Sequence, residues 1–431
     1  MTHFHELFEY HQNTKHSYFS VRSNPNRIDW NNPPNRFKTY SLDYKRIDLN
    51  KENQNSKFLY LIAGITAKKT YPNMEYYLRV NPSAGALYPN EIYFQVRNED
   101  GFEDGIYHYE VSSSSVTLLK KLSLNEGIEA NLGLDYSYDG FIFFISSLYF
   151  RSSWKYKNRA FRYCLLDAGH IIGSIEFSSY LFNKEFEIIY DFNKEEINKI
   201  FNFDNKEFFT SIVISGNKNE NKKQPLTLDI QTIDGTGYEE ENISFFEINN
   251  IIEQAYKDSI KIIQKTKQKD KSNYVFNKDL LQDTVFKRRS IREFSNQSIS
   301  KVQFESIMNI LNQPIASDCD EVVDIYYVIN RVQGMPLGLY KDGVCIKEGD
   351  LKEKAGYLCL EQDLGKSSAV TFFLASKSSN YQKAGIIGHR LYISSNYLNI
   401  GCSGIGAYYD DEVCELIGEN SMILYALAIG N

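Results

Sequence analysis

The feature that most constrains the fold is an internal repeat, because two similar halves of a chain fold into two similar domains. Segments 91–96 and 324–329 both predict β-strands, and a glycine, an apolar residue and a tyrosine follow each one at the same spacing. Apolar runs at 141–145 and 370–374 predict buried strands, and a helix with an Ala-Gly pair follows each run. The repeat predicts a pseudo-twofold dimer within one chain, with a ligand site between the halves as a natural option.

Composition divides the sequence into three parts. Residues 1–216 and 279–431 alternate between apolar strands and helices, and we expect each range to form one domain. Residues 217–278 predict a linker that opens with polar residues and contains a helix over 245–268. The basic run from Lys261 to Lys271 is typical of a solvated helix end.

Charge and cysteine content narrow the class of protein. The chain has 431 residues, and 48 basic against 55 acidic side chains give a net charge of −7, which argues against nucleic acid as the main partner. Six scattered cysteines predict reduced thiols, and neither they nor the histidines show the spacing of a metal site. We find no signal peptide and no apolar run near the roughly 20 residues of a membrane helix. We therefore expect a cytoplasmic protein.

One short basic segment predicts ligand binding. Arg288, Arg289, Ser290 and Arg292 precede a helix that we expect to begin near Ser300. Clustered guanidinium groups with a hydroxyl between them suit a phosphate group and carbonyl oxygens. A basic turn at the surface is the alternative interpretation.

A second segment, immediately before the strand 91–96, consists of small residues. Pro82, Ser83, Ala84 and Gly85 would let backbone amides come close to a flat ligand, and Ser83 adds a hydroxyl group. An ordinary turn is the alternative here.

Together these two segments resemble the FMN-dependent nitroreductase-like superfamily, and more closely the SagB-type azoline dehydrogenases, which include the cyanobactin oxidases. The resemblance covers nearly the whole chain. The matching segments are 14–16, 28–30, 83–89, 154–156, 159–163, 166–170, 288–294, 404–406 and 410–411.

The resemblance implies an α+β fold in which two nitroreductase-like domains, each a mainly antiparallel sheet flanked by helices, form an intrachain pseudodimer. It also implies FMN as the cofactor, held by the arginine motif of the second half opposite the loop 82–85 of the first half. Gly404, Ile405 and Gly406 would supply backbone amides near the flavin.

A pseudodimer would have a second ligand site with the roles of the two halves exchanged, which we call the second pseudo-site. In this chain the second pseudo-site departs from the family pattern. Near Arg22 it lacks paired arginines, and its loop at 314–320 has acidic side chains that would repel a phosphate. We therefore expect one FMN per chain. Relatives often have a basic residue after the last strand, where this chain ends in Gly and Asn, and Lys383 and Arg390 are candidates to replace it.

The resemblance further implies that Lys155 and Tyr156 are catalytic. Oxidation of a thiazoline or oxazoline to an azole requires loss of a ring proton and transfer of a hydride to the flavin, so the protein must provide orientation and a base. Arg151, Lys157 and Arg159 are near enough in sequence to supply a positive field. The alternative is that Lys155 is simply solvated at the start of a helix.

The predicted function is thus FMN-dependent oxidation of azoline rings in a peptide or peptide-like natural product, with the reduced flavin returned to oxygen. Two alternatives stay open: an NAD(P)H-dependent nitro or quinone reductase, and a non-catalytic scaffold of a cyclodehydratase complex. The expected partner is the azoline-containing substrate. A cyclodehydratase partner and a homodimer of the pseudodimers also stay open.

Overall fold

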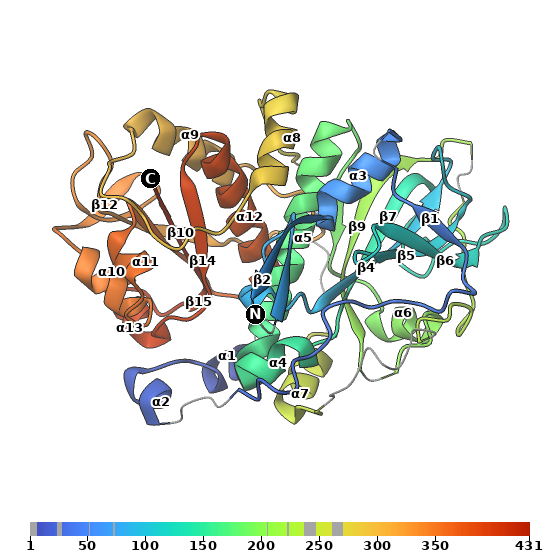
Figure 1. Ribbon diagram of the computed structural model, residues 1–431, viewed down its shortest axis with the longest axis horizontal. Coiled ribbons are helices and arrows are strands. Elements are labelled where there is room, and N and C mark those ends of the chain that lie inside the picture. The colour runs from blue at the N-terminus through green and yellow to red at the C-terminus, as the bar shows by residue number, and fades with distance from the viewer. Residues whose placement is uncertain are drawn as a thin grey trace. The chain divides into compact units, whose positions relative to one another are not determined.

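The chain divides into two compact units. The computed structural model describes residues 7–23, 28–50, 52–71, 74–204, 206–221, 224–236, 247–260 and 270–431. The described residues of unit 1 come from 1–27, 273–313 and 321–431, and those of unit 2 come from 28–272 and 314–320 (Figure 1). The units divide the chain differently from the predicted ranges 1–216, 217–278 and 279–431. Part of the N-terminus and 273–278 belong to unit 1, and the described residues of 217–272 and 314–320 belong to unit 2.

Specific contacts place the N-terminal segment in unit 1. His11, in α1 (Phe8–Asn13), is fully buried, and its Nδ1 lies 2.5 Å from the Tyr381 hydroxyl. The backbone N–H of His16 donates to the buried Asp410 carboxylate at 2.9 Å. Hydrogen bonds to the side chains of Tyr381 and Asp410, which lie far along the chain, therefore decide where this segment packs. The short α2 (Tyr18–Ser23) follows it.

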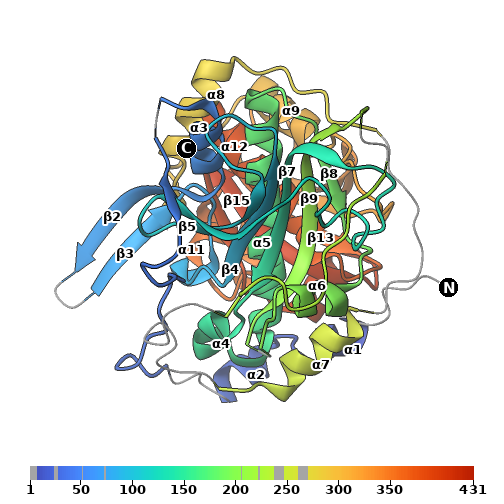
Figure 2. The same cartoon turned by 90° about the vertical axis from the view of Figure 1, so that its right-hand side faces the viewer.

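Unit 2 is built on a seven-stranded sheet in which every pair of neighbouring strands is antiparallel. The strand order is β1-β6-β5-β4-β7-β9-β8. The strands are β1 (Arg46–Asp48), β4 (Asn90–Arg97), β5 (Gly105–Glu110), β6 (Ser115–Lys121), β7 (Tyr138–Ser147), β8 (Glu187–Ile189) and β9 (Phe208–Lys218). β2 (Ile65–Tyr71) and β3 (Met74–Arg79) form a separate hairpin, which Figure 2 shows apart from the main sheet.

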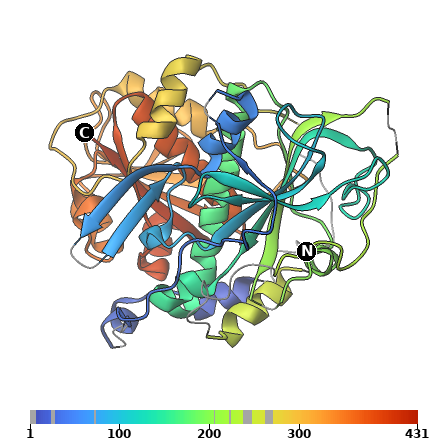
Figure 3. The same ribbon diagram turned by 45° about the vertical axis from the view of Figure 1, so that its right-hand side comes forward.

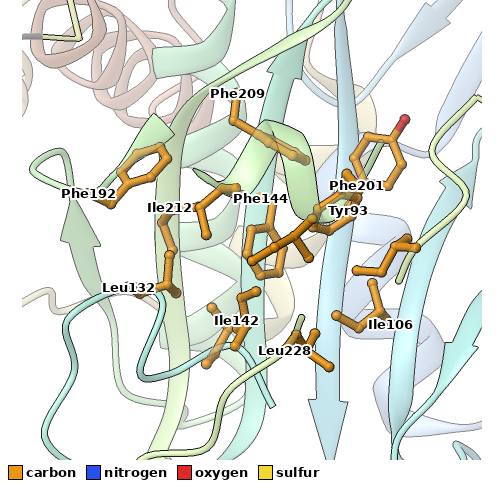
Figure 4. Packing of buried hydrophobic residues seen from close by; sticks show 14 of the residues in the cluster. Tyr93, Ile106, Leu132, Ile142, Phe144, Phe192, Phe201, Phe209, Ile212 and Leu228 are labelled. Carbon is orange, nitrogen blue, oxygen red and sulfur yellow. The ribbon is translucent and has the colours of Figure 1, made fainter. Parts of the chain in front are cut away.

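Helices cover both faces of this sheet. They are α3 (Gln54–Ala63), α4 (Phe150–Tyr156), α5 (Ala160–Leu181), α6 (Lys194–Ile200) and α7 (Asn250–Asp258). On one face Tyr93, Phe144 and Ile212 pack against Ile197 and Phe201 at α6, and Figure 4 shows several of these side chains interlocking. The other face packs against α3 and α5, the long helix that lies along the strands in Figure 3.

Unit 1 has a six-stranded antiparallel sheet with the strand order β12-β11-β10-β13-β15-β14. The strands are β10 (Asp324–Ile329), β11 (Gly338–Lys341), β12 (Val344–Glu348), β13 (Val370–Ser376), β14 (Gly401–Ile405) and β15 (Met422–Gly430). The helices are α8 (Lys278–Lys287), α9 (Lys301–Leu311), α10 (Lys352–Leu358), α11 (Asp363–Ser367), α12 (Tyr381–Tyr397) and α13 (Asp410–Ile417).

The two sheets repeat each other in order and in register. Strands β6-β5-β4-β7-β9-β8 of unit 2 correspond in order to β12-β11-β10-β13-β15-β14 of unit 1. In unit 2 Tyr93 pairs with His108, and in unit 1 Tyr326 pairs with Lys341, each on the neighbouring hairpin strand. The predicted repeat and the predicted α+β fold with antiparallel sheets are therefore confirmed.

Individual elements also match or differ from the prediction. The helix expected near Ser300 is α9, which begins with a capping box between Ser300 and Gln303. The predicted strand 91–96 is β4, which is buried over its whole length, and its Glu91 is paired with the buried Arg151. Of the predicted helix 245–268, α7 is observed, and 261–269 lies outside the described residues.

No helix among the described residues is long and apolar enough to cross a membrane.

Candidate functional site

The loop before β4 contains the predicted small residues and is tied to helix α5. The Ser83 hydroxyl donates to the Asp167 carboxylate at 2.5 Å, and the Ala84 N–H donates to the same carboxylate at 3.2 Å. The Tyr88 N–H donates back to Ser83 Oγ at 2.9 Å. The hydrogen of Ser83 is therefore directed at Asp167, and what this hydroxyl offers to a ligand in this state is an acceptor lone pair.

The same loop has a strained backbone. Gly85, Ala86 and Tyr88 have φ angles of 63°, 53° and 46°, in the left-handed region that costs side-chain-bearing residues energy. Its far end is anchored by the buried Arg151, which donates to the Tyr88 carbonyl at 2.9 Å. Such strain persists only where the surrounding structure holds both ends of a segment, and it concentrates at functional sites.

The predicted catalytic pair lies directly over this loop. A Cβ atom on Gly85 would sit 2.8 Å from the Tyr156 hydroxyl and 3.2 Å from Lys155 Nζ, so both polar groups reach the glycine. Lys155 and Tyr156 end helix α4 and are half-buried. The Tyr156 ring lies 4.3 Å from that of Tyr163 on α5, which holds it in place. Unit 2 thus brings together Lys155, Tyr156 and the loop 82–85, with Pro82 buried at the start of the loop.

In unit 1 the arginine motif gathers around a tyrosine of α12. The buried Tyr392 hydroxyl lies 2.8 Å from Ser290 Oγ and accepts the Gly404 N–H at 2.6 Å. The guanidinium group of Arg288, which is 3% exposed, lies 5.2 Å from the centre of the Tyr392 ring. Ser290 also bridges to Cys402, so the motif runs beside strand β14.

The other residues of unit 1 that were predicted to bind the cofactor do not all contact Tyr392. Arg289 is half-buried and donates to the Phe286 carbonyl at 3.1 Å, whereas Arg292 is exposed. Ile405 packs into the core of unit 1. The Gly404 amide is already bonded to a tyrosine, and a Cβ there would collide with Tyr425.

That the sets in the two units face each other stays a prediction, as does the contact of Gly404, Ile405 and Gly406 with a flavin.

Asp167 has the most unusual electrostatic environment in unit 2. It is 4% exposed, and burial raises the pKa of its carboxyl group to about 7, although the bonds from Ser83 and Ala84 favour the ionised form. No cation bonds to it among the described residues. A carboxyl group that changes charge near neutral pH beside candidate catalytic groups is typical of a functional residue.

In the predicted second pseudo-site, Arg22 and Asp318 are bonded to other residues of the protein. Arg22 pairs with Glu361 at 2.7 Å, and the buried Asp318 accepts the Tyr190 N–H at 2.8 Å. The candidate phosphate ligands are also bonded, because Lys383 Nζ donates to the Glu321 carbonyl at 2.6 Å. Arg390 is fully buried and donates to the carbonyl of Gln313 at 2.5 Å.

The sequence did not identify two residues of the site, Asp167 and Tyr392. Asp167 lies in the matched segment 166–170, and a carboxylate within an apolar helix stripe was a signal that could have singled it out. Tyr392 carried no such signal, because its contacts to Ser290 and Gly404 join segments far apart in the sequence.

Comparison with known proteins identifies the fold. No family model matches the chain. A crystal structure from Anabaena variabilis, named as a candidate nitroreductase, matches with a TM-score of 0.80 and 23% identity, covering 99% of each chain. The match shows that the whole chain has this nitroreductase fold, and at this identity it shows the fold alone.

Two further relatives match only in part. A Methanocaldococcus jannaschii protein, also named as a candidate nitroreductase, is 30% identical over 126 residues, which are 28% of this chain. The chain spans 58% of the length of that relative. A structure of the Escherichia coli microcin synthetase complex matches at 17% identity over 46% of this chain and 73% of the other, with a TM-score of 0.33.

Proposed function

We propose that this chain is an FMN-dependent dehydrogenase that oxidises thiazoline or oxazoline rings to azoles in a peptide or peptide-like natural product. The proposal is supported by the full-length match to a nitroreductase fold and by the resemblance of its motifs to SagB-type dehydrogenases. The observation that carries it is the convergence of Lys155 Nζ and the Tyr156 hydroxyl on the bare backbone of Gly85.

The residues of both units suit FMN. Arg288 offers a charged, forked donor and Ser290 a hydroxyl, which together match a phosphate group. Gly85 is exposed, and its lack of a side chain lets the Tyr156 hydroxyl and Lys155 Nζ come close to the backbone there. The buried Ser403 hydroxyl beside Gly404 has no hydrogen-bond partner among the described residues, which leaves it available to a bound group.

The proposed reaction assigns separate tasks to the protein and the cofactor. Oxidation of an azoline removes a proton from one ring carbon and a hydride from its neighbour, and the single bond between them becomes a double bond. Bound FMN supplies the hydride acceptor. Lys155 Nζ takes the proton, and the Tyr156 hydroxyl, fixed by its ring contact with Tyr163, orients the ring.

The test compares three proteins in one assay. Wild type, Lys155→Ala and the control Lys199→Ala, which alters an exposed lysine of α6, are purified, and released flavin is counted per chain. Each is then incubated with a synthetic azoline peptide, and loss of two hydrogens is followed by mass spectrometry. We expect about one FMN per chain in all three, and azole formation in all but Lys155→Ala, with a loss of roughly 10²–10⁴-fold.

Other results would change the assignment. Full turnover by Lys155→Ala contradicts the role of this lysine. Rapid anaerobic bleaching of the flavin by NADPH, without azole formation, would replace the proposal with a nitro or quinone reductase. A colourless protein that takes up no added FMN would leave the scaffold role. Because an azoline arises by cyclodehydration, a cyclodehydratase is the proposed partner.

A further inference from the structure

We propose that Asp167 is a positioning residue that sets whether the Ser83 hydroxyl offers a hydrogen or a lone pair to a bound flavin. This inference rests on the proposed FMN-dependent function and concerns the loop 82–88. Asp167 is buried on α5, and the two groups that donate hydrogen bonds to it, the Ser83 hydroxyl and the Ala84 N–H, both belong to this loop.

The direction of the Ser83 hydrogen follows from counting donors. With Asp167 ionised, the carboxylate can only accept, so Ser83 must donate to it across the 2.5 Å contact. Because Ser83 Oγ already accepts the Tyr88 N–H, one lone pair is left for a ligand. With Asp167 protonated, the carboxyl group can donate to Ser83 Oγ instead, and the Ser83 hydrogen becomes free to bond a flavin nitrogen or oxygen.

Two further observations support a role beyond packing. The loop keeps three residues at positive φ, and Asp167 holds its beginning while Arg151 holds its end. The groups that face Asp167 are the Ser83 hydroxyl and the Ala84 amide from the loop, and the Cys164 thiol from its own helix. Burial raises the pKa of that thiol to about 12, so it stays neutral near pH 7. Asp167 is thus a buried carboxyl group without a paired cation among the described residues.

The second half of the chain shows that this arrangement is not a general requirement of the fold. The Ala-Gly pairs at 168–169 and 384–385 match in the repeat, so Lys383 occupies the position of Asp167. Lys383 Nζ donates to the Glu321 carbonyl, in the segment that precedes β10. In the first half the corresponding residue is instead a carboxyl group whose pKa is raised by burial to about 7 and which accepts the Ser83 hydroxyl.

The charge on Asp167 gives the direction in which FMN affinity should change with pH. Ionisation of Asp167 places a negative charge behind the loop and turns the Ser83 hydrogen away from the ligand. FMN affinity should therefore fall about three- to tenfold between about pH 6 and about pH 8, which corresponds to the loss of one hydrogen bond.

The experiment measures FMN dissociation constants by flavin fluorescence at both pH values, for wild type, Asp167→Asn and Ser83→Ala. The amide introduced by Asp167→Asn cannot ionise and can donate to Ser83, so we expect this variant to lose the part of the pH dependence that comes from Asp167 and to keep only the part that comes from the FMN phosphate. Ser83→Ala should bind more weakly than wild type at the lower pH and should show a smaller fall in affinity as pH rises, and it tests the proposal even if Asp167→Asn does not fold. Riboflavin, which lacks the phosphate that itself titrates at about pH 6, should show the same contrast.

Asp318→Asn is the matched control. Asp318 is also a buried carboxyl group of unit 2 that accepts two backbone N–H groups, from Tyr190 and Asp191. This variant should keep the wild-type pH dependence of FMN binding.

Thermal unfolding without FMN separates positioning from simple stability. The raised pKa of Asp167 means that its ionisation costs folding free energy as pH rises toward about 7, so Asp167→Asn should gain stability relative to wild type at the higher pH. A more stable variant that has lost the Asp167 part of the pH dependence of binding supports a positioning role. If wild type and Asp167→Asn show the same affinity and the same pH dependence, the positioning role is overturned while the FMN proposal stands. If no protein binds FMN, the proposed function itself fails.

Discussion

Each unit contains a tyrosine, a glutamate and a lysine in contact, but in unit 2 all three side chains are buried, whereas in unit 1 the lysine and the glutamate are partly exposed. In unit 2 the Tyr93 hydroxyl donates to Glu207 at 2.9 Å, and Lys38 Nζ lies 2.6 Å from both. The Lys38 and Glu207 side chains are only 2% and 1% exposed.

In unit 1 the matching tyrosine, Tyr326, donates to Glu419 at 2.7 Å and lies 3.0 Å from Lys341 Nζ. Here the lysine and glutamate side chains are 23% and 37% exposed. The lysines reach the tyrosines from different places, because Lys341 is on the neighbouring strand and Lys38 lies outside the sheet.

The comparison shows that contacts between the same residue types contribute differently to the free energy of folding when they are buried and when they are partly exposed. Burial lowers the pKa of Lys38, although Glu207 opposes the shift, whereas hydrogen bonding to Tyr326 raises the pKa of Lys341. In the buried set each partner is needed to compensate the desolvation of the other. In the exposed set water can replace either partner.

The largest expected effect comes from removing the buried lysine. Lys38→Met leaves the Glu207 carboxylate buried without its cation, and we expect a loss of about 3–5 kcal/mol in the free energy of unfolding. Urea denaturation followed by circular dichroism measures it. A loss below about 1 kcal/mol would mean that the buried set is no more costly to break than the exposed one.

The next prediction concerns the carboxylates two residues before these tyrosines, Glu91 in β4 and Asp324 in β10. Burial would raise the pKa of Glu91, but Arg151 at 2.6 Å and His108 at 3.0 Å lower it to about 2. This lowered pKa stabilises the fold above the ordinary pKa of a glutamate, and the contribution is lost as pH falls through about 2.

We expect Glu91→Gln to cost roughly 3 kcal/mol near neutral pH, with the difference from wild type shrinking toward about pH 2. Unfolding free energies measured across this pH range give the profile. The half-exposed Asp324, in Asp324→Asn, should cost less than about 1 kcal/mol. A Glu91→Gln difference that does not change with pH would show that Glu91 is not held ionised by its partners.

A smaller effect distinguishes the two arginine segments. Arg288→Ala should weaken FMN binding roughly 10- to 100-fold, because it removes charged hydrogen bonds worth about 1.5–3 kcal/mol. Arg22→Ala should leave the affinity unchanged, since that guanidinium group is engaged by Glu361 and the Tyr409 hydroxyl. Titration of the apoprotein with FMN measures both, and equal losses would argue for a second FMN in the Arg22 pseudo-site.

The smallest effect should come from the exposed lysine. We expect Lys341→Met to change the unfolding free energy by no more than about 1 kcal/mol, because the lysine and its carboxylate partners are accessible to water. The same urea experiment compares it directly with Lys38→Met. If the two variants lost equal stability, burial would not be what separates the two sets.

Much of the fold could be predicted because its signals are local. The apolar runs in β7 and β13 and the small polar start of α9 are read from neighbouring residues, and the repeat doubles each signal. The candidate catalytic pair and the loop 82–85 were also singled out from short motifs. Their proximity in unit 2 could not be read from those motifs, because a loop and a helix about 70 residues apart meet only through the packing of the chain.

The sequence by itself determined the doubled α+β architecture, the central strands β4, β7, β10 and β13, and the short segments that carry the site chemistry. Only the tertiary structure decided which polar groups are buried and with what partners: that Asp167 holds Ser83, that Tyr392 holds Ser290, and that residues 7–23 belong to unit 1. The physical reason is that secondary structure follows from periodicity along the chain, whereas desolvation and hydrogen bonding depend on residues that folding brings together from far apart.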